Sequence, residues 1–216
     1  MDIGAGITFG NGVSVTKQPP PPSNKAIFGY GSTETKTAIT NLVSNTGVVA
    51  TDTTGVGTAR SGLAAAGYGT DKAIFGYGYN AGYLSMTNKV SNTGVVAADT
   101  TGVGTGRNGS AAAGYGTDKA IFGYGGGGTL LSVTNLVSNT GVVAADTTGV
   151  GTARYGLAAA GYGVDLAIFG YGQLGGPTYT NLSMTNLVSN TGVVATDTTG
   201  VGTARNGLAA SSYGYA

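Results

Sequence analysis

The chain of 216 residues contains no cysteine, no histidine and no tryptophan, and only 9% of its residues are charged. Without cysteine it has no disulfide framework, and without cysteine or histidine it lacks the usual sulfur and nitrogen ligands of transition metals. The same absences exclude catalytic sites that need an imidazole or a thiol. The net charge of +1 offers no electrostatic attraction to DNA or RNA, so we expect no nucleic-acid partner.

Targeting and membrane-spanning patterns are also missing. The first sixteen residues have neither a basic region nor an unbroken apolar core, so we expect no secretory signal. The uncharged stretch 120–145 is interrupted throughout by Gly, Ser, Thr and Asn, which is not typical of a spanning helix. We therefore expect a soluble protein with no signal peptide, no transmembrane segment and no membrane insertion.

Glycine, in contrast, is abundant, with 42 residues where a typical chain has ~7%. A collagen triple helix is excluded because the strict Gly-X-Y period is missing. The hydrophobic content of 41% and the low charge argue against simple disorder. These figures favour a β-rich structural or binding protein.

The sequence contains four copies of one repeat. The string K-A-I-F-G-Y-G starts at residues 25, 72 and 119, and L-A-I-F-G-Y-G starts at residue 166. A second string, N-x-V-S-N-T-G-V-V-A, has steps of 47, 47 and 51 residues, so the last copy carries four extra residues. The copies are 25–71, 72–118, 119–165 and 166–216.

Each copy predicts four short strands separated by turns rich in Asn, Thr and Gly. The first strand is the Ala-rich run, as at 64–69, and the second is K-A-I-F-G-Y-G. The third alternates apolar and polar residues, as from Ile39 to Val43, and V-V-A-T-D-T-T supplies the fourth. Four strands with a period near 47 residues suit the blade of a β-propeller, and an open β-solenoid is the alternative.

The phase of the repeat favours the propeller. Residues 25–216 hold four whole copies, and the chain is cut inside the hairpin between the Ala-rich strand and K-A-I-F-G-Y-G. In a ring, the last Ala-rich strand, 208–216, can complete the first blade and remove exposed sheet edges. We therefore predict an all-β fold with a four-bladed β-propeller over 25–216, closed by the C-terminal strand, after an N-terminal segment 1–24.

The stretch A-R-x-G-L-A-A-A-G-Y-G-T-D-K-A-I-F-G-Y-G resembles the first two strands of a kelch repeat. In kelch repeats an Arg-x-Gly opens the inner strand and paired glycines end the second, whereas here the glycines are split, as in Gly76-Tyr77-Gly78. The copies, and the opening I-G-A-G-I-T-F-G-N-G-V-S-V, also resemble kelch-like structural proteins of tailed, cyanophage-like phages. This resemblance implies a kelch-like propeller in a virion, with other virion proteins as partners.

Apolar and small residues alternate near the N-terminus, ahead of four prolines at 19–22 that favour a stiff polyproline spacer. The alternation predicts a short hairpin or an added strand. We interpret this segment as an anchor that adds a strand to a partner, and the alternative is a partly disordered tail. The candidate anchor residues are Ile7, Phe9, Val13 and Val15.

One aspartate and one arginine recur in every copy. A ring of four carboxylates suggests a cation site, but each loop offers a single carboxylate where calcium loops supply several ligands. We therefore favour a turn, or a pair with the arginine of the repeat, and expect no metal and no cofactor. The arginines are expected to bond blade to blade. These residues are Asp52, Asp99, Asp146 and Asp197, and Arg60, Arg107, Arg154 and Arg205.

The copies differ most in the loop between the second and third strands. Such loops vary without disturbing a scaffold, so this is the best candidate for a recognition surface, and drift in an unconstrained loop is the alternative. The candidate binding residues there are Tyr79, Asn80, Tyr83, Gln173 and Tyr179.

Catalysis is not expected, because Glu34 is the only glutamate and no repeat breaks the symmetry of the copies with an extra acid for glycoside hydrolysis. We predict a non-enzymatic fibre, decoration or adsorption protein of a tailed-phage virion, anchored by residues 1–18. Its loops would face a host-surface glycan or receptor, and a homo-oligomer is compatible with this. The alternative is a free, lectin-like glycan binder with one weak site per blade, and a hydrolase is a weaker third option.

Overall fold

The computed structural model describes residues 7–9, 13–15, 25–176 and 179–213. Every regular element in these ranges is a β-strand, which confirms the predicted all-β class. Within the same ranges, no helix is both long enough and apolar enough to cross a membrane.

The N-terminal segment contains a short hairpin. Strands β1 (Ile7–Phe9) and β2 (Val13–Val15) pair antiparallel, with Ile7 opposite Val15 and Phe9 opposite Val13. The hairpin predicted from the alternating pattern is therefore confirmed. The proline run at 19–22 lies outside the described residues, as do all other residues of 16–24.

Four small antiparallel sheets follow one another along the chain. The first has two strands and each of the others has three. Their bounds are β3 (Ala26–Ser32) and β4 (Lys36–Val43); β5 (Ala64–Tyr68), β6 (Lys72–Gly76) and β7 (Thr87–Val90); β8 (Ala111–Tyr115), β9 (Lys119–Gly126) and β10 (Leu130–Val137); β11 (Ala158–Tyr162), β12 (Leu166–Leu174) and β13 (Thr180–Val188).

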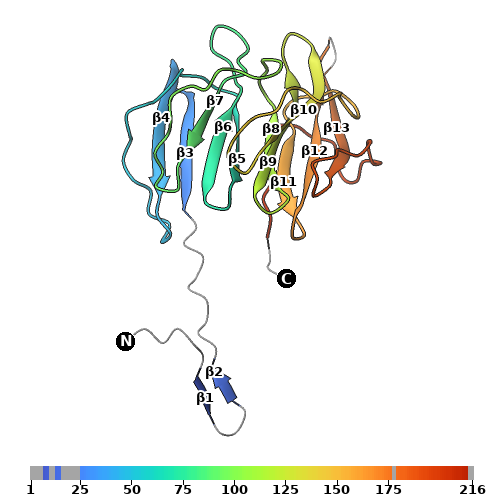
Figure 1. Ribbon diagram of the computed structural model, residues 1–216. Coiled ribbons are helices and arrows are strands. Elements are labelled where there is room, and N and C mark those ends of the chain that lie inside the picture. The colour runs from blue at the N-terminus through green and yellow to red at the C-terminus, as the bar shows by residue number, and fades with distance from the viewer. Residues whose placement is uncertain (1–6, 10–12, 16–24, 177–178, 214–216) are drawn as a thin grey trace.

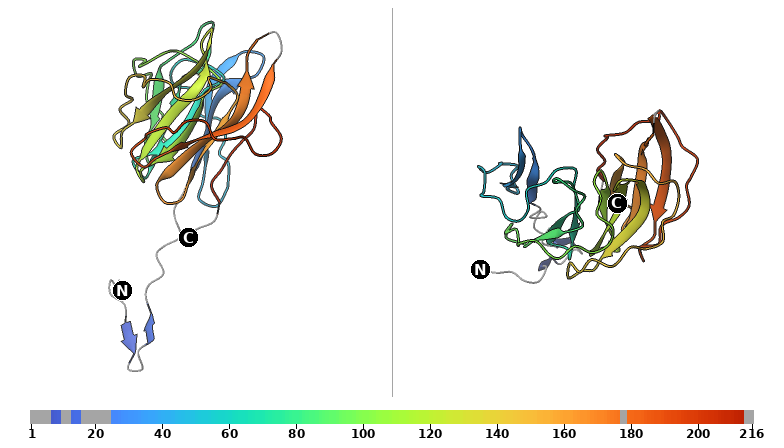
Figure 2. Two further views of the ribbon diagram at one scale, coloured as in Figure 1. Left: turned by 90° about the vertical axis from the view of Figure 1, so that its right-hand side faces the viewer. Right: turned by 90° about the horizontal axis from the view of Figure 1, so that it is seen from above.

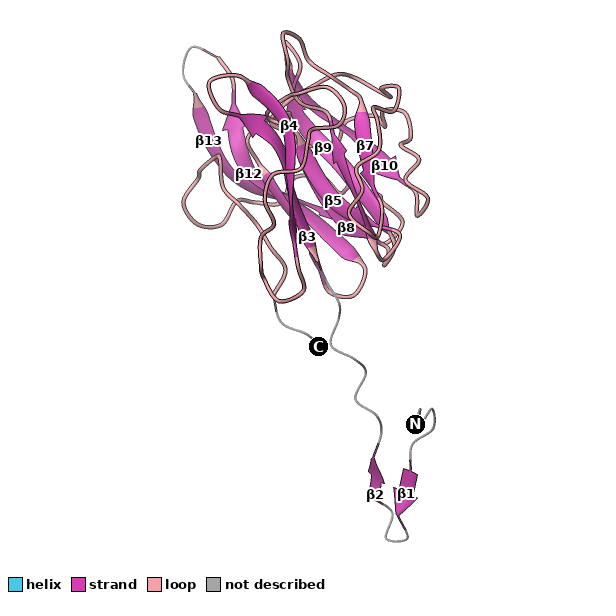
Figure 3. Cartoon of the chain, turned by 90° about the vertical axis from the view of Figure 1, so that its left-hand side faces the viewer, coloured by secondary structure: helices cyan, strands magenta, loops and turns pink. Residues whose placement is uncertain are grey.

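The four sheets stand side by side (Figure 1), and from above they follow an arc with the first and fourth sheets at its ends (Figure 2, right). Figure 3 looks from the side of the first sheet, with β3 and β4 nearest the viewer. The Ala-rich strands β5, β8 and β11 pack against one another in turn. The predicted hairpin from the Ala-rich strand into the next copy is formed three times, as where Tyr68 faces Lys72.

The Gly-Tyr-Gly triplet is a β-bulge in the first, third and fourth sheets, and in the second sheet β6 ends at Gly76, just before the tyrosine. In the first sheet, the pairing of β3 with β4 shifts register between Gly29 and Gly31. The central tyrosine adopts a left-handed φ of 62–64° in every copy, which costs about 1–3 kcal/mol for a non-glycine residue. This backbone conformation turns the tyrosine side chain toward the next sheet. The contact between sheets therefore compensates the backbone strain.

The predicted fourth strand is wrong as an extended strand. In the first sheet, residues 48–53 meet β4 only at two isolated bridges, Val43 with Val49 and Thr40 with Thr53. Between the bridges, the Asn41 side chain donates to the carbonyl oxygen of Ala50 at 3.2 Å and to Asp52 at 2.8 Å. A side chain therefore holds the segment where a ladder was expected, and the other copies repeat this arrangement.

The predicted closing strand is not formed either. Residues 208–213 lie outside any strand, residues 214–216 are not described, and β3 pairs with β4 alone. Here Ser211-Ser212 replaces the Ala-Gly of the other copies. The inner strands approach closely at that glycine, since a Cβ on Gly161 would lie 3.3 Å from the oxygen of Gly114. The repeat thus departs from its pattern where the strands have least room.

Candidate functional site

Successive sheets are joined by a contact that we call the inter-sheet clamp. It consists of the bulge tyrosine of one sheet, the phenylalanine of the next sheet, and the arginine of the segment between them. Between the second and third sheets, the rings of Tyr77 and Phe122 meet edge to face at 5.2 Å. A Cβ on Gly76 would lie 2.7 Å from the Phe122 ring, so glycine is required there.

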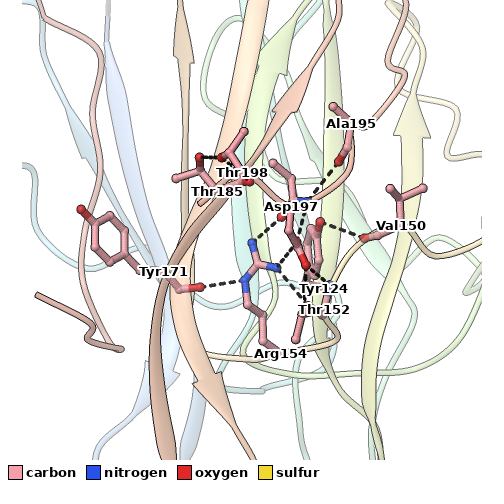
Figure 4. A network of polar contacts seen from close by, with 10 residues as sticks. Tyr124, Val150, Thr152, Arg154, Tyr171, Thr185, Ala195, Asp197 and Thr198 are labelled. Atoms are coloured by element: carbon pink, nitrogen blue, oxygen red, sulfur yellow. Dashed lines mark hydrogen bonds and ion pairs between the residues drawn. The ribbon is translucent and has the colours of Figure 1, made fainter. Parts of the chain in front are cut away.

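The arginine is the buried centre of the clamp. The Arg107 guanidinium lies 3.7 Å from the centre of the Tyr77 ring, and its Nη2 donates to Asn135 Oδ1 at 2.6 Å. Arg107 and Asn135 both have 0% exposure. Arg60 and Arg154 are equally buried and make the same bonds, to Asn88 and Asn186. Figure 4 shows Arg154 against Tyr124, Asp197 and the carbonyl oxygen of Tyr171.

Each clamp also holds an aspartate at its rim. Asp146 accepts from the backbone N–H and the hydroxyl of Thr105 at 2.9 and 2.6 Å, and from Asn135 at 2.9 Å. Burial alone would raise the pKa of Asp146, but these bonds and the charge of Arg107 together hold that pKa below its usual value. Asp99 and Asp197 are placed alike, with lowered pKa values.

The arginine pairs with the aspartate of the following copy. Arg107 Nη1 lies 3.9 Å from Asp146 Oδ1, and Arg60 and Arg154 face Asp99 and Asp197 at 3.8 and 3.7 Å. The four carboxylates therefore belong to separate sheets. No group of three His, Cys, Asp or Glu side chains that could hold a metal ion occurs in the described part of the chain.

Three clamps are complete. The residues of a fourth are separated, with its tyrosine and arginine at one end of the array and its phenylalanine at the other. At the far end, Arg205 lies 4.1 Å from the Tyr171 ring but is exposed, and among the described residues its side chain donates only to Thr203. At the near end, Phe28 is 62% exposed, whereas its three equivalents are at most 4% exposed. Asp52 accepts there from Asn41 but faces no arginine among the described residues.

A second contact is divided in the same way. Tyr68 packs on Gly141 of the next sheet, so closely that a Cβ on Gly141 would lie 2.7 Å from the Tyr68 ring. Tyr115 packs in the same way on Gly192. Both tyrosines are 4% exposed, whereas Tyr162 is 39% and Tyr213 is 98% exposed. A groove of about 1020 Å³ lies between the first and second sheets; its lining includes Ala26, Ile27, Ala66, Gly67 and Gly94. In the described part of the chain, no inner strand of the first sheet covers this groove.

The variable loops gather at one end of the array, the upper end in Figure 1. Isolated bridges join Ser61 to Tyr79 and Tyr155 to Gln173, and a third joins Asn108 to Gly126. The position after each clamp arginine also varies between copies, as Ser61, Asn108, Tyr155 and Asn206. Sequence reasoning missed this position, although its variation inside an otherwise constant string was a usable signal.

The structure brings some of the predicted binding residues together. The rings of Tyr79 and Tyr83 meet edge to face at 5.3 Å, and Lys36 Nζ lies 5.5 Å from the Tyr79 ring. Asn80 sits in the same loop, where its N–H donates to the carbonyl oxygen of Gly82. Gln173 pairs with Tyr155. Tyr179 is 69% exposed in the loop of the fourth sheet.

A pocket of about 400 Å³ opens at this variable end, between the second, third and fourth sheets. The residues that line it are Tyr83, Asn108, Gly126, Gly128, Thr129, Leu130, Tyr155, Gly175 and Gly176. Most of these are positions at which the copies differ.

The opposite end of the array is nearly constant. The turns there read S-N-T-G in all four copies, and Y-G-T-D or Y-G-V-D between the Ala-rich strand and the next. Asp118 accepts from Asn139 across two of these turns at 3.0 Å. The chain enters β3 at this end, at Ala26.

The clamps, the open ends and the variable end are the features on which a function can rest. A scan against models of known protein families finds no match for the chain, and a search of curated proteins finds no significant match.

Proposed function

We propose that the protein is a non-enzymatic display protein whose sheet array is tethered at one end and offers its other end to a partner. The observation that carries this proposal is the polarity of the array. The chain enters β3 at Ala26, and the loops that vary between copies lie beyond Ser32, at the other end of the same strand. A tether at the constant end leaves the variable end accessible.

The setting that we propose is the virion of a tailed phage, as a fibre, decoration or adsorption protein. The resemblance of the repeats and of the opening segment to phage structural proteins supports this setting. The N-terminal segment, with Ile7, Phe9, Val13 and Val15 paired across its hairpin, would attach to another virion protein by strand addition.

We also propose that the array closes into a four-bladed propeller. Its two ends carry complementary halves of one clamp. In the complete clamps, the arginine Nη2 bonds an asparagine, so Arg205 has its counterpart in Asn41. Phenylalanine packs on glycine, so Phe28 has its counterpart in Gly170. Residues 209–213 would then pair with β3 and set Tyr213 against Gly94, in the groove of the first sheet.

Particle incorporation tests the tether. Antibodies against the array should label the surface of particles that contain the protein, and deletion of residues 1–18 should release it without changing its melting temperature. Particles that retain the shortened chain, or a full chain found only free in solution, would overturn the proposal.

The second candidate function is a free, lectin-like glycan binder. The aromatic pocket at the variable end is the observation that favours it. The two functions differ in the tether: a free lectin needs no particle, and a display protein does.

A further inference from the structure

We infer that the pocket between Tyr83 and Tyr155, which we call the tyrosine pocket, binds a neutral pyranose ring. This inference rests on the proposed display function, because it names the chemistry that the variable end would recognise. Its volume of about 400 Å³ falls in the ~300–1,000 Å³ range of small-ligand sites.

The lining suits one face of a sugar. Tyr83 and Tyr155 line the pocket and are both partly exposed. A tyrosine ring presents an apolar face together with a polar hydroxyl, and a pyranose presents an apolar C–H face together with a rim of hydroxyls. Leu130 adds a further apolar surface. No charged side chain lines the pocket, which favours a neutral ligand over an anionic one.

The polar side chains of the pocket are available to a ligand. Among the described residues, no hydrogen bond is made by the hydroxyls of Tyr83, Thr129 and Tyr155 or by the side-chain amide of Asn108. At the equivalent position of the last copy, Asn206 instead donates to Asn181 at 2.7 Å. Hydroxyls and an amide are the groups that donate to and accept from sugar hydroxyls.

Glycines create the space. Tyr79 directly follows the Gly-Tyr-Gly of the second sheet and packs edge to face against Tyr83, whereas the same position in the third sheet is Gly126. A Cβ on Gly126 would touch nothing closer than Leu130 at 3.7 Å, and the φ of Gly126 is not left-handed. Tyrosine at position 126 would therefore fit the fold and occupy the space that the sugar needs.

Saturation-transfer NMR on the full chain tests the site, with the methyl pyranosides of glucose, galactose, mannose and N-acetylglucosamine as probes and N-acetylneuraminic acid as the anionic comparison. At least one neutral pyranoside should bind. Tyr155→Ala and Gly126→Tyr should each weaken that binding by roughly tenfold or more, with an unchanged melting temperature. Tyr162→Ala, which changes a partly exposed tyrosine at the constant end and outside the lining, is the matched control and should bind as the wild type does.

Three results would overturn the inference: no transfer to any of the four neutral pyranosides, equal binding by Gly126→Tyr, or a preference for the anionic sugar. Failure here is separate from failure of the tether. A chain that is incorporated into particles but binds no sugar loses only the tyrosine pocket, whereas a chain that binds sugar and never joins a particle loses only the display proposal.

Discussion

The three complete clamps and the two open ends are built from the same residues, yet those residues behave differently. Phe28 and Phe122 occupy the same position of the same heptapeptide, but the first is 62% exposed and the second 0%. Among the described residues, the first sheet has neither a preceding sheet nor an inner Ala-rich strand beside β3, and the third sheet has both. Burial in this fold is therefore a property of the interface between sheets, as in other repeat architectures, and no copy is self-sufficient.

The largest effect on stability is expected from removing residues 207–216, which would leave the open ends unable to meet. If the ends meet, the deletion removes Leu208 and Tyr213, and burial of such a side chain contributes about 1.5–3 kcal/mol. The strand hydrogen bonds to β3 would be lost as well, at about 1 kcal/mol each. We expect an aggregated chain, or one whose melting temperature by circular dichroism falls by more than about 10 °C.

Adding the peptide 207–216 in trans should restore the shortened chain. A shortened chain that stays monomeric and melts within about 3 °C of the full one would show that the ends remain open.

Paired arginine substitutions come next in size. Arg107→Ala leaves the buried Asn135 Oδ1 without its donor and Asp146 without its nearest cation, so it should lower the free energy of unfolding by about 3–5 kcal/mol in urea titrations. If the ring closes, Arg205→Ala should cost nearly as much. In an open array Arg205 contacts the Tyr171 ring and donates to the carbonyl oxygen of Thr203, and a loss below about 1 kcal/mol would mark that end as free.

Much of the fold was predictable from the sequence because the repeat fixes it. The hairpin between the Ala-rich strand and the next copy follows from the phase of the repeat, and the structure has it three times. The fourth strand was not predictable from β-propensity, because the Asn41 side chain and its equivalents replace the backbone ladder. The number of repeats did not predict whether the ring closes. The last Ala-rich strand has Ser211-Ser212 where the other copies have Ala-Gly, at the point where neighbouring inner strands approach closely.

The candidate site was partly predictable. A polar pair between the recurring arginine and aspartate was expected, but the partner of Arg60 is Asp99 of the next sheet rather than Asp52, which precedes it by eight residues in the sequence. Such a choice depends on how the sheets stack. The tyrosine pocket was missed because it is made by absent side chains at Gly126 and Gly175, and a glycine in a loop gives no sign of what surrounds it.

Alkaline pH should weaken the complete clamps. Burial raises the pKa of Tyr77 and Tyr124 to about 12, so the folded state favours their neutral form. Stability from these groups is fully present below the ordinary tyrosine pKa of about 10 and is lost as the pH rises toward 12. The loss should approach about 2 kcal/mol for each tyrosine, measured by urea unfolding from pH 9 to 12.

Tyr77→Phe is the control for the alkaline loss, because it keeps the ring against Phe122 and removes only the titrating hydroxyl. Its stability should fall less steeply between pH 10 and 12 than that of the wild type. An identical slope would assign the alkaline loss to other groups.

The smallest change in melting temperature is expected from deleting residues 1–22. Strands β1 and β2 form a two-stranded sheet of their own, and neither strand pairs with a strand of the four sheets. The deletion also leaves Phe28 and β3 in place. The melting temperature should therefore stay within about 3 °C of that of the full chain, far from the effect of the C-terminal deletion.

Because both deletions remove chain from the same constant end of the array, their contrast isolates what the C-terminal segment does for the first sheet. A collapse of the folded state on losing residues 1–22 would instead show that the N-terminal segment covers the exposed side of the first sheet, and the tether would have to be abandoned.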